Sequence, residues 1–292
     1  MELWLSEEHT PGYRVQWRVR KVIYCTKSRF QDIAIVEMQD FGRALVLDGI
    51  VQTTIADEFY YHEMIAHVPL CSHPKPLSVL VIGGGDGGAV REVLKHNLVK
   101  RVVLVEIDEA VVSACREYLP ELSAGLDDPR VSLVITDGQG YLEGCINEFD
   151  VILVDSPDPI GPAAELFAGD FYASIFTALK DDGLFAAQTE SPLFNREIFS
   201  RVVASVKCLF PIVRPYLTVV PTYTSGYWSF TIGSKKYDPL QPLRPVDWSG
   251  AKFYRSAVHR AAFELPLAVG NLVPGWLGTP PGVAKETTAG RK

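Results

Sequence analysis

The segment VIGGGDGGAV, residues 81–90, decides which fold the sequence predicts. It follows an apolar run typical of a buried strand and leads into a segment of helical character. Gly83, Gly85 and Gly88 fit the Gly-x-Gly-x-x-Gly pattern of loops that bring the backbone close to the pyrophosphate of a dinucleotide. Asp86 stands inside this loop, where its carboxylate would compete with a phosphate for the same positive helix end. The pattern therefore predicts a nucleotide-type binding loop, and Asp86 argues against a phosphate as its ligand.

Apolar runs and amphipathic segments alternate from this loop onward, which predicts a doubly wound α/β domain with a mostly parallel sheet. Strands are expected at residues 78–83, 101–108, 131–136, 149–155, 183–190, 213–221 and 227–234, and helices at 89–95, 109–119 and 196–210. The last two strands are separated only by TYTSG, residues 222–226. Because a parallel crossover needs about a dozen residues or more, these two strands should pair antiparallel. A sheet that ends in this way is typical of a class I methyltransferase-like Rossmann fold rather than of a nicotinamide dehydrogenase.

The first part of the chain is predicted to form a separate β-domain. Residues 13–19 alternate apolar and polar side chains, as a half-buried strand does. Asp48-Gly49 lies between two apolar runs and favours a two-residue hairpin turn. The segment that follows has helical character, with Asp57 placed to cap the helix. The predicted domains are an N-terminal β-sheet domain with a linking helix (1–75), a Rossmann-like domain (76–275) and a disordered tail (276–292).

The composition of the chain bounds its partners and its compartment. The formal net charge of −7 argues against nucleic acid as a partner and suits a cationic small molecule. The first residues do not resemble a signal peptide, and no apolar stretch is long enough to cross a membrane. The five cysteines form no Cys-x-x-Cys pair, so they indicate neither a zinc site nor a disulfide framework. We therefore expect a cytoplasmic protein with no nucleic acid or membrane as partner.

Acidic residues follow the predicted parallel strands at their carboxyl ends, the edge at which ligands bind in open α/β sheets. Glu106 ends the second of these strands, where a carboxylate can accept hydrogen bonds from both hydroxyls of a ribose. Asp137 and Gly138 follow the third strand, where a carboxylate and a backbone N–H can bind an adenine edge, although a plain turn is the alternative. Together with the glycine loop, these residues predict a site for an adenosine-type ligand.

The segment VDSPDPIGP leaves the fourth strand at the same edge and points to a second, cationic ligand. Asp155 and Asp158 lie three residues apart in this proline-stiffened segment, and two neighbouring carboxylates at pH 7 favour a cation between them. Tyr61 and Tyr223 add aromatic faces, which attract ammonium groups, and His62 lies beside Tyr61. Taken singly, each of these residues also fits turn formation or ordinary packing. As a group, they predict a site for an amine.

Six strings of the sequence carry a resemblance to a known family: GRALVLDGIVQTT, DEFYYHEM, VLVIGGGDGGAVREVLKH, VEIDE, DSPDPIGPA and PTYTSGYWSFTIGSKKY. In this order they resemble the spermidine synthases, the polyamine aminopropyltransferases, and most closely their bacterial members. The resemblance runs from about Ser28 to the string FYRSAVHRAAFELP, nearly the whole chain. It implies transfer of an aminopropyl group from decarboxylated S-adenosylmethionine to putrescine, which gives spermidine and methylthioadenosine. It further implies a homodimer or homotetramer, with neither a metal nor a permanently bound cofactor.

The resemblance also implies roles for individual residues. Asp155 would accept the proton of the attacking amine, whose pKa of about 10.4 keeps it protonated in water. The donor would be held by Gln31, Gly83, Gly85, Asp86, Glu106, Asp137, Gly138 and Pro162. The polyamine would be held by Tyr61, His62, Asp86, Asp155, Ser156, Pro157, Asp158, Gln188 and Tyr223. Asp86 would pair with the amine of the aminopropyl group and repel the carboxylate of ordinary S-adenosylmethionine. His62 or Glu58 would provide or position an anchor for the distal amine.

Three residues depart from the family pattern. Pro157 replaces a Ser or Thr, Leu193 replaces a Trp, and Thr224 replaces a Pro. All three are expected to flank the amine pocket, so the acceptor stays open among putrescine, cadaverine, agmatine and a longer polyamine. For the reaction, the alternative is a class I S-adenosylmethionine methyltransferase, which would share the sheet, the glycine loop and Glu106.

Overall fold

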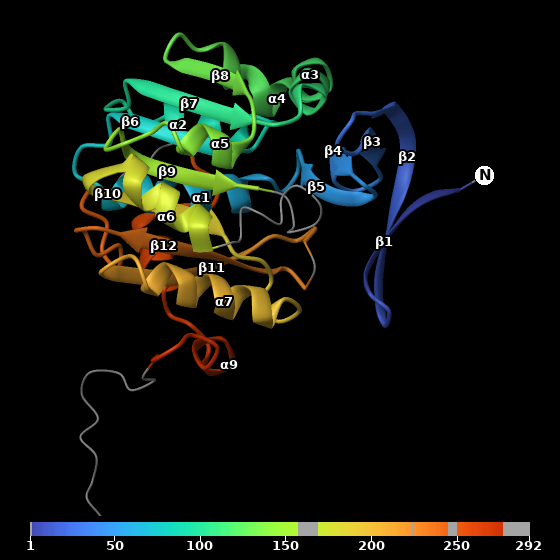
Figure 1. The fold of residues 1–292 in the computed structure, drawn as a ribbon. Helices are drawn as coiled ribbons and strands as arrows, with labels where there is room; N and C mark the ends of the chain where they lie inside the picture. The colour runs from blue at the N-terminus through green and yellow to red at the C-terminus, as the bar shows by residue number, and fades with distance from the viewer. Residues whose placement is uncertain (1, 157–168, 224, 245–249, 277–292) are drawn as a thin grey trace, which may run out of the picture.

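The computed structural model describes residues 2–156, 169–223, 225–244 and 250–276. These residues form two sheets joined by helix α1 (Figure 1). The N-terminal sheet is antiparallel with its strands in chain order, and its long first hairpin projects from the rest. Its strands are β1 (Leu3–Thr10), β2 (Tyr13–Lys27), β3 (Asp32–Met38), β4 (Gly42–Leu47) and β5 (Ile50–Thr54).

The second sheet has the strand order β11-β12-β10-β9-β6-β7-β8. Its strands are β6 (Ser78–Gly83), β7 (Arg101–Glu106), β8 (Val131–Ile135), β9 (Phe149–Asp155), β10 (Leu179–Gln188), β11 (Ile212–Val219) and β12 (Tyr227–Ser234). The strands from β10 through β8 pair in parallel, whereas β12 runs antiparallel to both β10 and β11. The predicted fold class, a mostly parallel Rossmann-like sheet with an antiparallel last strand after an N-terminal β-domain, is confirmed.

Helices cover both faces of this sheet because the side chains of its buried strands alternate between two cores. Val79 and Val81 of β6 pack in one cluster with α1 and α2, and Leu80 and Ile82 pack in the other with α6 and α7. Burial of each such side chain stabilises the fold by roughly 1.5–3 kcal/mol. The helices are α1 (Phe59–Ser72), α2 (Gly88–Leu94), α3 (Glu109–Tyr118), α4 (Pro120–Ser123), α5 (Gly138–Leu142), α6 (Gly169–Ala178), α7 (Arg196–Lys207), α8 (Ser256–Ala262) and α9 (Leu267–Gly270), with a 3₁₀ turn η1 (Ala124–Asp127).

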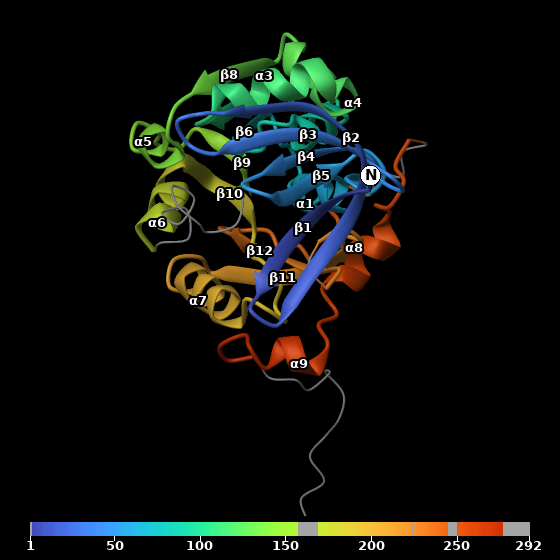
Figure 2. The same ribbon diagram turned by 90° about the vertical axis from the view of Figure 1, so that its right-hand side faces the viewer.

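A third apolar cluster fixes the N-terminal sheet to the α/β sheet. Ile33 and Ile35 of β3 and Leu45 of β4 pack there against Val111 and Cys115 of α3. As a result, the N-terminal sheet lies across the end of the parallel sheet to which the β9 arrow points, and β1 and β2 pass in front of that end in Figure 2. The carboxyl ends of the parallel strands, where the predicted ligand residues lie, are therefore covered by the N-terminal strands.

The structure confirms the predicted turn at Asp48-Gly49 but not the predicted cap of α1. Asp48 and Gly49 form the β4–β5 turn with φ of 49° and 82°, the left-handed geometry that such a turn requires. The expectation that Asp57 caps α1 is wrong, because the helix begins at Phe59 after Glu58 and has no side-chain cap. The Asp57 carboxylate instead accepts hydrogen bonds from Thr54 Oγ1 at 2.6 Å and from Thr222 N and Oγ1 at 2.9 and 2.7 Å. It therefore ties the start of α1 to the β11–β12 turn.

Of the tail predicted to be disordered, only Trp276 lies within the described residues, where it packs against Gly270. Across the described parts of the chain, we find no helix with the length and apolar character needed to cross a membrane.

Candidate active site

A cavity of about 260 Å³ lies between the N-terminal sheet and the carboxyl ends of β6, β7 and β9. It is lined by thirteen of the predicted donor and polyamine residues: Gln31, Tyr61, His62, Gly83, Gly85, Asp86, Glu106, Asp137, Gly138, Asp155, Ser156, Gln188 and Tyr223. Pro157, Asp158 and Pro162, the other predicted site residues, lie outside the described residues. The donor and amine residues inferred separately from the sequence thus share one cavity.

The glycine loop between β6 and α2 is shaped by the side chains packed against it. A Cβ atom at Gly84 would overlap the Asp155 carboxylate, and one at Gly88 would overlap the His62 ring. Gly84 also has a φ of 70°, which side chains other than glycine rarely adopt. The loop therefore needs glycine at these two positions, so that the side chains of Asp155 and His62 can lie directly against its backbone.

Asp155 lies at the end of β9 with its two carboxylate oxygens in different surroundings. Oδ1 accepts a hydrogen bond of 2.7 Å from the Tyr61 hydroxyl. Oδ2 is buried and has no hydrogen-bond partner among the described residues. Burial raises the pKa of Asp155 to about 6, although the positive charge of His62 and the Tyr61 hydroxyl act in the opposite direction. An under-bonded carboxylate with this pKa has the properties of a proton acceptor.

His62 lies between two carboxylates, those of Glu58 and Asp86. Its Nδ1 is 2.7 Å from Glu58 Oε2, and its Nε2 is 3.6 Å from Asp86 Oδ1. Burial lowers the pKa of His62, but Asp86 and Glu58 outweigh burial and raise the pKa well above its usual value. Its two acidic neighbours therefore favour the protonated form of the imidazole in the wall of the cavity.

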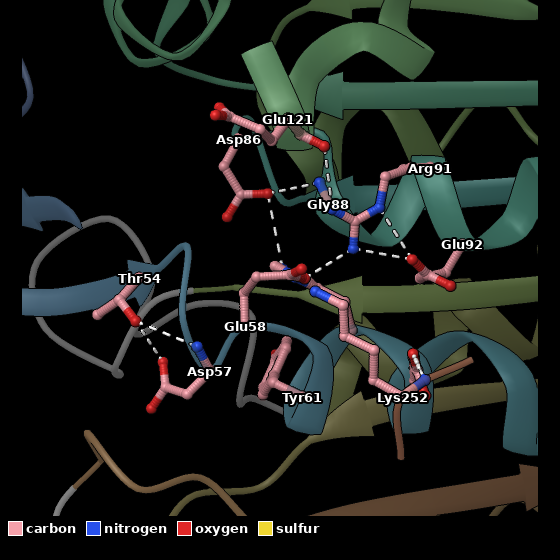
Figure 3. A network of polar contacts seen from close by, with 12 residues as sticks. Thr54, Asp57, Glu58, Tyr61, Asp86, Gly88, Arg91, Glu92, Glu121 and Lys252 are labelled. Atoms are coloured by element: carbon pink, nitrogen blue, oxygen red, sulfur yellow. Dashed lines mark hydrogen bonds and ion pairs between the residues drawn. The ribbon is translucent and has the colours of Figure 1, made fainter. Parts of the chain in front are cut away.

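Glu58 does not serve as the amine anchor that the sequence suggested. It is buried, it does not line the cavity, and Arg91 Nη2 donates a hydrogen bond of 2.7 Å to its Oε2 (Figure 3). Burial raises the pKa of Glu58, but His62 and Arg91 outweigh burial and lower it. The two charged neighbours of Glu58 are therefore His62 and Arg91, which are side chains of the protein itself and not a ligand.

Glu106 lies at the end of the cavity at which the sequence predicts the donor. Its Oε2 accepts from Gly85 N at 3.2 Å and its Oε1 from Asp108 N at 2.9 Å. Burial raises the pKa of Glu106 to about 7, while these N–H groups lower it. Gln31 reaches the same end from the N-terminal sheet and donates to Asp108 Oδ2 at 3.0 Å. The side chain of Asp137 accepts a hydrogen bond of 2.6 Å from Gly140 N and caps α5. The alternative to ligand binding, a structural role in a turn, therefore applies to one of the two carboxylate oxygens of Asp137.

The structure adds lining residues that the sequence analysis missed. Glu7 and His9 come from β1, a strand that was not predicted, and Gln52 and Trp228 come from β5 and β12. Glu7 is buried, its Oε2 accepts from Trp17 Nε1 at 3.1 Å, and His9 Nε2 lies 3.1 Å from its other oxygen. The local signal for this strand was weak, because Leu3, Trp4 and Leu5 are three apolar residues in a row and do not alternate with polar ones.

The residues that depart from the family pattern fall into two groups. Pro157 and Thr224 lie outside the described residues. Leu193 was expected to flank the amine pocket, but it is exposed and does not line the cavity. Its neighbour Phe194 stacks on Tyr13 of the N-terminal hairpin at a centroid distance of 5.1 Å. Leu193 thus lies on the surface beside this contact and away from the cavity.

A group of side chains with metal-ligating atoms occurs elsewhere among the described residues, at His73, Asp150 and Asp182. His73 Nδ1 accepts a hydrogen bond of 3.1 Å from Lys75 N, so the neutral ring carries its proton on Nε2 and offers no lone pair there to a metal ion. Lys180 Nζ lies 3.0 Å from Asp150 Oδ1 and already balances that carboxylate. The donor chemistry of this cluster does not fit a metal ion.

Comparisons with known proteins agree over most of the chain. A model described as spermine/spermidine synthase domain matches residues 58–242, and one described as spermidine synthase tetramerisation domain matches residues 3–54. A polyamine aminopropyltransferase of Caldicellulosiruptor bescii is 52% identical over 274 residues, covering 94% of this chain and 99% of that protein. A polyamine aminopropyltransferase of Moorella thermoacetica is 51% identical over 269 residues, covering 90% and 94%.

Solved structures give the same result. A spermidine synthase in complex with the transition state analogue AdoDATO superposes with a TM-score of 0.91 at 44% identity, covering 93% of this chain and 95% of that one. The spermidine synthase of Thermotoga maritima has a TM-score of 0.88 at 42% identity, covering 93% and 94%. The chain therefore belongs to the spermidine synthase family and is a polyamine aminopropyltransferase.

Proposed function

We propose that the protein transfers the aminopropyl group of decarboxylated S-adenosylmethionine to putrescine, giving spermidine and methylthioadenosine, with Asp155 as the general base. The observation that carries this proposal is the Asp155 carboxylate. It lies in one cavity with Glu106 and Asp86, its Oδ1 is held by Tyr61, and its Oδ2 has no hydrogen-bond partner among the described residues. A complex of a related spermidine synthase with AdoDATO adds support for a bound transition state of this kind.

The chemistry follows from the charges of the two substrates. The attacking amine enters as an ammonium and must lose a proton before its lone pair can form the new C–N bond. Asp155, with a pKa of about 6, takes this proton as the C–S bond breaks and its electron pair returns to sulfur. The sulfonium thereby becomes the neutral thioether of methylthioadenosine. Because the sulfonium already activates the neighbouring carbon, the reaction requires no metal.

Asp86 selects the donor. In this proposal its carboxylate pairs with the ammonium of the aminopropyl group, which decarboxylation leaves without a neighbouring carboxylate. The carboxylate of ordinary S-adenosylmethionine would meet Asp86 as a like charge, which disfavours the methyltransferase alternative. We expect Asp86→Asn to weaken use of the decarboxylated donor, and unchanged kinetic constants for that donor would contradict this role.

The acceptor is bound at the end of the cavity that carries Tyr61, Tyr223 and Glu7. The Tyr223 hydroxyl donates to Gln52 O at 2.7 Å, and Glu7 lies beside the adjacent residue Val51, with 3.5 Å between Val51 N and Glu7 Oε2. Glu7 is therefore the acid that we assign to the distal ammonium of putrescine. Cadaverine, agmatine and a longer polyamine remain the alternative acceptors, because one methylene changes binding by only about 1–3 kcal/mol.

Product analysis tests the proposal directly. The purified protein is incubated with decarboxylated S-adenosylmethionine and an equimolar mixture of the amines, and spermidine and methylthioadenosine are quantified. The methyltransferase alternative is tested by supplying S-adenosylmethionine instead. Asp155→Asn should reduce turnover by about 10²- to 10⁴-fold while methylthioadenosine still binds. Turnover like that of the wild type in this variant would contradict the role of Asp155.

The assembly and the compartment are also proposals. The match of residues 3–54 to a tetramerisation domain supports a homotetramer, which sedimentation velocity can test. All five cysteines are free in the structure, which suits the cytoplasmic location expected from the sequence.

A further inference from the structure

Glu58 and Arg91 lie behind the wall of the cavity and do not line it. We propose that they are positioning residues for aminopropyl transfer: they hold His62 as a fixed imidazolium, and this cation keeps Asp155 in the deprotonated form that accepts the proton. The inference rests on the function proposed above and concerns how the base of that reaction is kept ready.

The position of His62 is fixed on both ring nitrogens. Nδ1 faces Glu58 at 2.7 Å, Nε2 faces Asp86 at 3.6 Å, and the ring lies over Gly88, where any Cβ would displace it. The Tyr61 ring packs edge-on against it with 5.4 Å between ring centroids. An imidazolium carries an N–H on both ring nitrogens, so it donates to Glu58 and also presents an N–H to Asp86 at ion-pair distance, whereas a neutral ring with its proton on Nδ1 presents only a lone pair to Asp86. The geometry therefore favours the charged ring.

Arg91 keeps Glu58 in place and ionised. Its guanidinium donates to Glu58 Oε2 at 2.7 Å, to Glu92 Oε1 at 2.9 Å and to the Glu121 carbonyl at 3.1 Å (Figure 3). With three groups of the guanidinium bound, Arg91 is a rigid partner on α2 for a glutamate that precedes α1. The charges then alternate from Arg91 through Glu58 and His62 to Asp86, so that each charge has an opposite neighbour.

Asp155 is the group whose protonation depends on this arrangement. The ionisable groups that surround His62 are Glu58 and Tyr61 at α1, Asp86 and Arg91 at the glycine loop and α2, Asp155 at β9, Tyr223 beside Tyr61, and Cys115 of α3 near Asp86. Burial and the charge of Asp86 raise the pKa of Asp155, while the charge of His62 lowers it. Without the imidazolium, Asp155 would be protonated at a pH at which the reaction needs its lone pair.

The decisive variant is Glu58→Gln, which removes the charge behind His62 and leaves the cavity wall intact. We expect the acidic limb of kcat/KM to move to higher pH by about one unit, which corresponds to roughly a 5-fold loss near pH 6 and a much smaller loss near pH 8.5. The matched control is Glu63→Gln, the same substitution at another buried glutamate, on the same helix, which binds the backbone N–H groups of residues 252–254 and does not contact His62. Its acidic limb should stay where it is in the wild type.

Arg91→Gln separates charge from position. This variant frees Glu58, which weakens its support of the imidazolium, but it also removes a cation near His62, so the two effects on the charge of His62 partly cancel. We expect kcat/KM to fall at all pH values, with an upward shift of the acidic limb smaller than that of Glu58→Gln. An equal shift in Glu58→Gln and in Glu63→Gln, or no shift in Glu58→Gln, would overturn the proposal, because either result would mean that Glu58 acts only through the fold.

A readout without substrates keeps the proposal testable if Glu58→Gln does not fold or if the proposed reaction is not observed. The imidazole resonances of the six histidines are followed by NMR against pH in the wild type, and His62 is assigned with a His62→Gln variant. We expect the pKa of His62 to lie well above the usual value of about 6.5, because Glu58 and Asp86 favour the charged ring. Titration of His62 near pH 6.5 in the wild type would overturn the inference whatever the protein catalyses.

Discussion

Asp155→Asn should stabilise the folded protein while it removes the proposed general base. The Asp155 Oδ2 atom is buried without a hydrogen-bond partner among the described residues, so its negative charge is incompletely compensated when no ligand is bound. Asparagine keeps a carbonyl oxygen for the hydrogen bond from Tyr61 and carries no charge. The substitution therefore removes the source of strain and retains the one strong contact.

The pKa of Asp155 gives the magnitude and the pH range. Burial raises this pKa from 3.8 to about 6 in the folded state. A difference of about two units corresponds to ~3 kcal/mol, and the partial contact of the side chain with solvent lowers the expected gain to about 1–3 kcal/mol. Because the folded-state pKa is the higher one, the folded protein binds the extra proton between about pH 4 and pH 6. The wild type therefore loses stability as the pH rises through this range, and asparagine does not.

Urea unfolding of the two proteins without ligands, followed between pH 4.5 and pH 8, measures this difference. The gain of Asp155→Asn in the free energy of unfolding should grow with pH and level off above about pH 6. Asp40→Asn is the control for loss of one negative charge, because Asp40 is exposed on the N-terminal sheet. A gain that does not vary with pH, or a variant less stable than the wild type at pH 8, would refute the reasoning.

Three further predictions test other parts of the site. Gly88→Ala should lower kcat/KM at least ~10-fold, because a methyl group there must displace the His62 ring, and a value like that of the wild type would show that the ring has room to move. Glu63→Gln should lower the free energy of unfolding by ~2 kcal/mol, since the carboxylate accepts three backbone N–H groups from residues 252–254; a change below the error of urea unfolding would contradict this account. Burial raises the pKa of Glu106 to about 7, and only the ionised carboxylate accepts hydrogen bonds from both ribose hydroxyls. Titration calorimetry should therefore find that methylthioadenosine binds more weakly at pH 6 than at pH 8. Equal affinity at the two pH values would argue against a bond between Glu106 and the ribose.

The parts of the fold that the sequence predicted depend on local patterns. The apolar run of β6, the glycine loop and the Asp48-Gly49 turn each follow from neighbouring residues. The short link before β12 fixed the antiparallel pairing in the same way. The candidate site could be assembled because parallel strands bring their carboxyl ends to one edge, so Glu106 and Asp155 had to lie near the loop.

The parts that the sequence did not predict depend on contacts between distant residues. Asp57 resembles a helix cap in the sequence, but its carboxylate is used by Thr222, 165 residues away. Glu7 becomes a cavity residue only because the N-terminal sheet docks on α3, and no local pattern encodes that docking. Glu58 and Arg91, 33 residues apart, meet because α1 and α2 pack side by side. Such pairings follow from tertiary packing, which a periodicity in the sequence does not describe.

The stability that Asp155 costs and the reactivity that it gains have the same physical origin. Burial disfavours the charge on Asp155, which destabilises the empty site and also raises the pKa to the range of a useful base. Asp86 adds a second buried carboxylate, and in the proposed reaction the cationic donor and amine neutralise both when they bind. In the proposed arrangement, the positive charge of His62 keeps Asp86 and Asp155 ionised before the substrates bind. Glu58, held by Arg91, stabilises that charge on the side of the ring away from Asp86. A glycine loop that carries an acid instead of cradling a phosphate is thus one part of a site whose charges are balanced for cationic substrates.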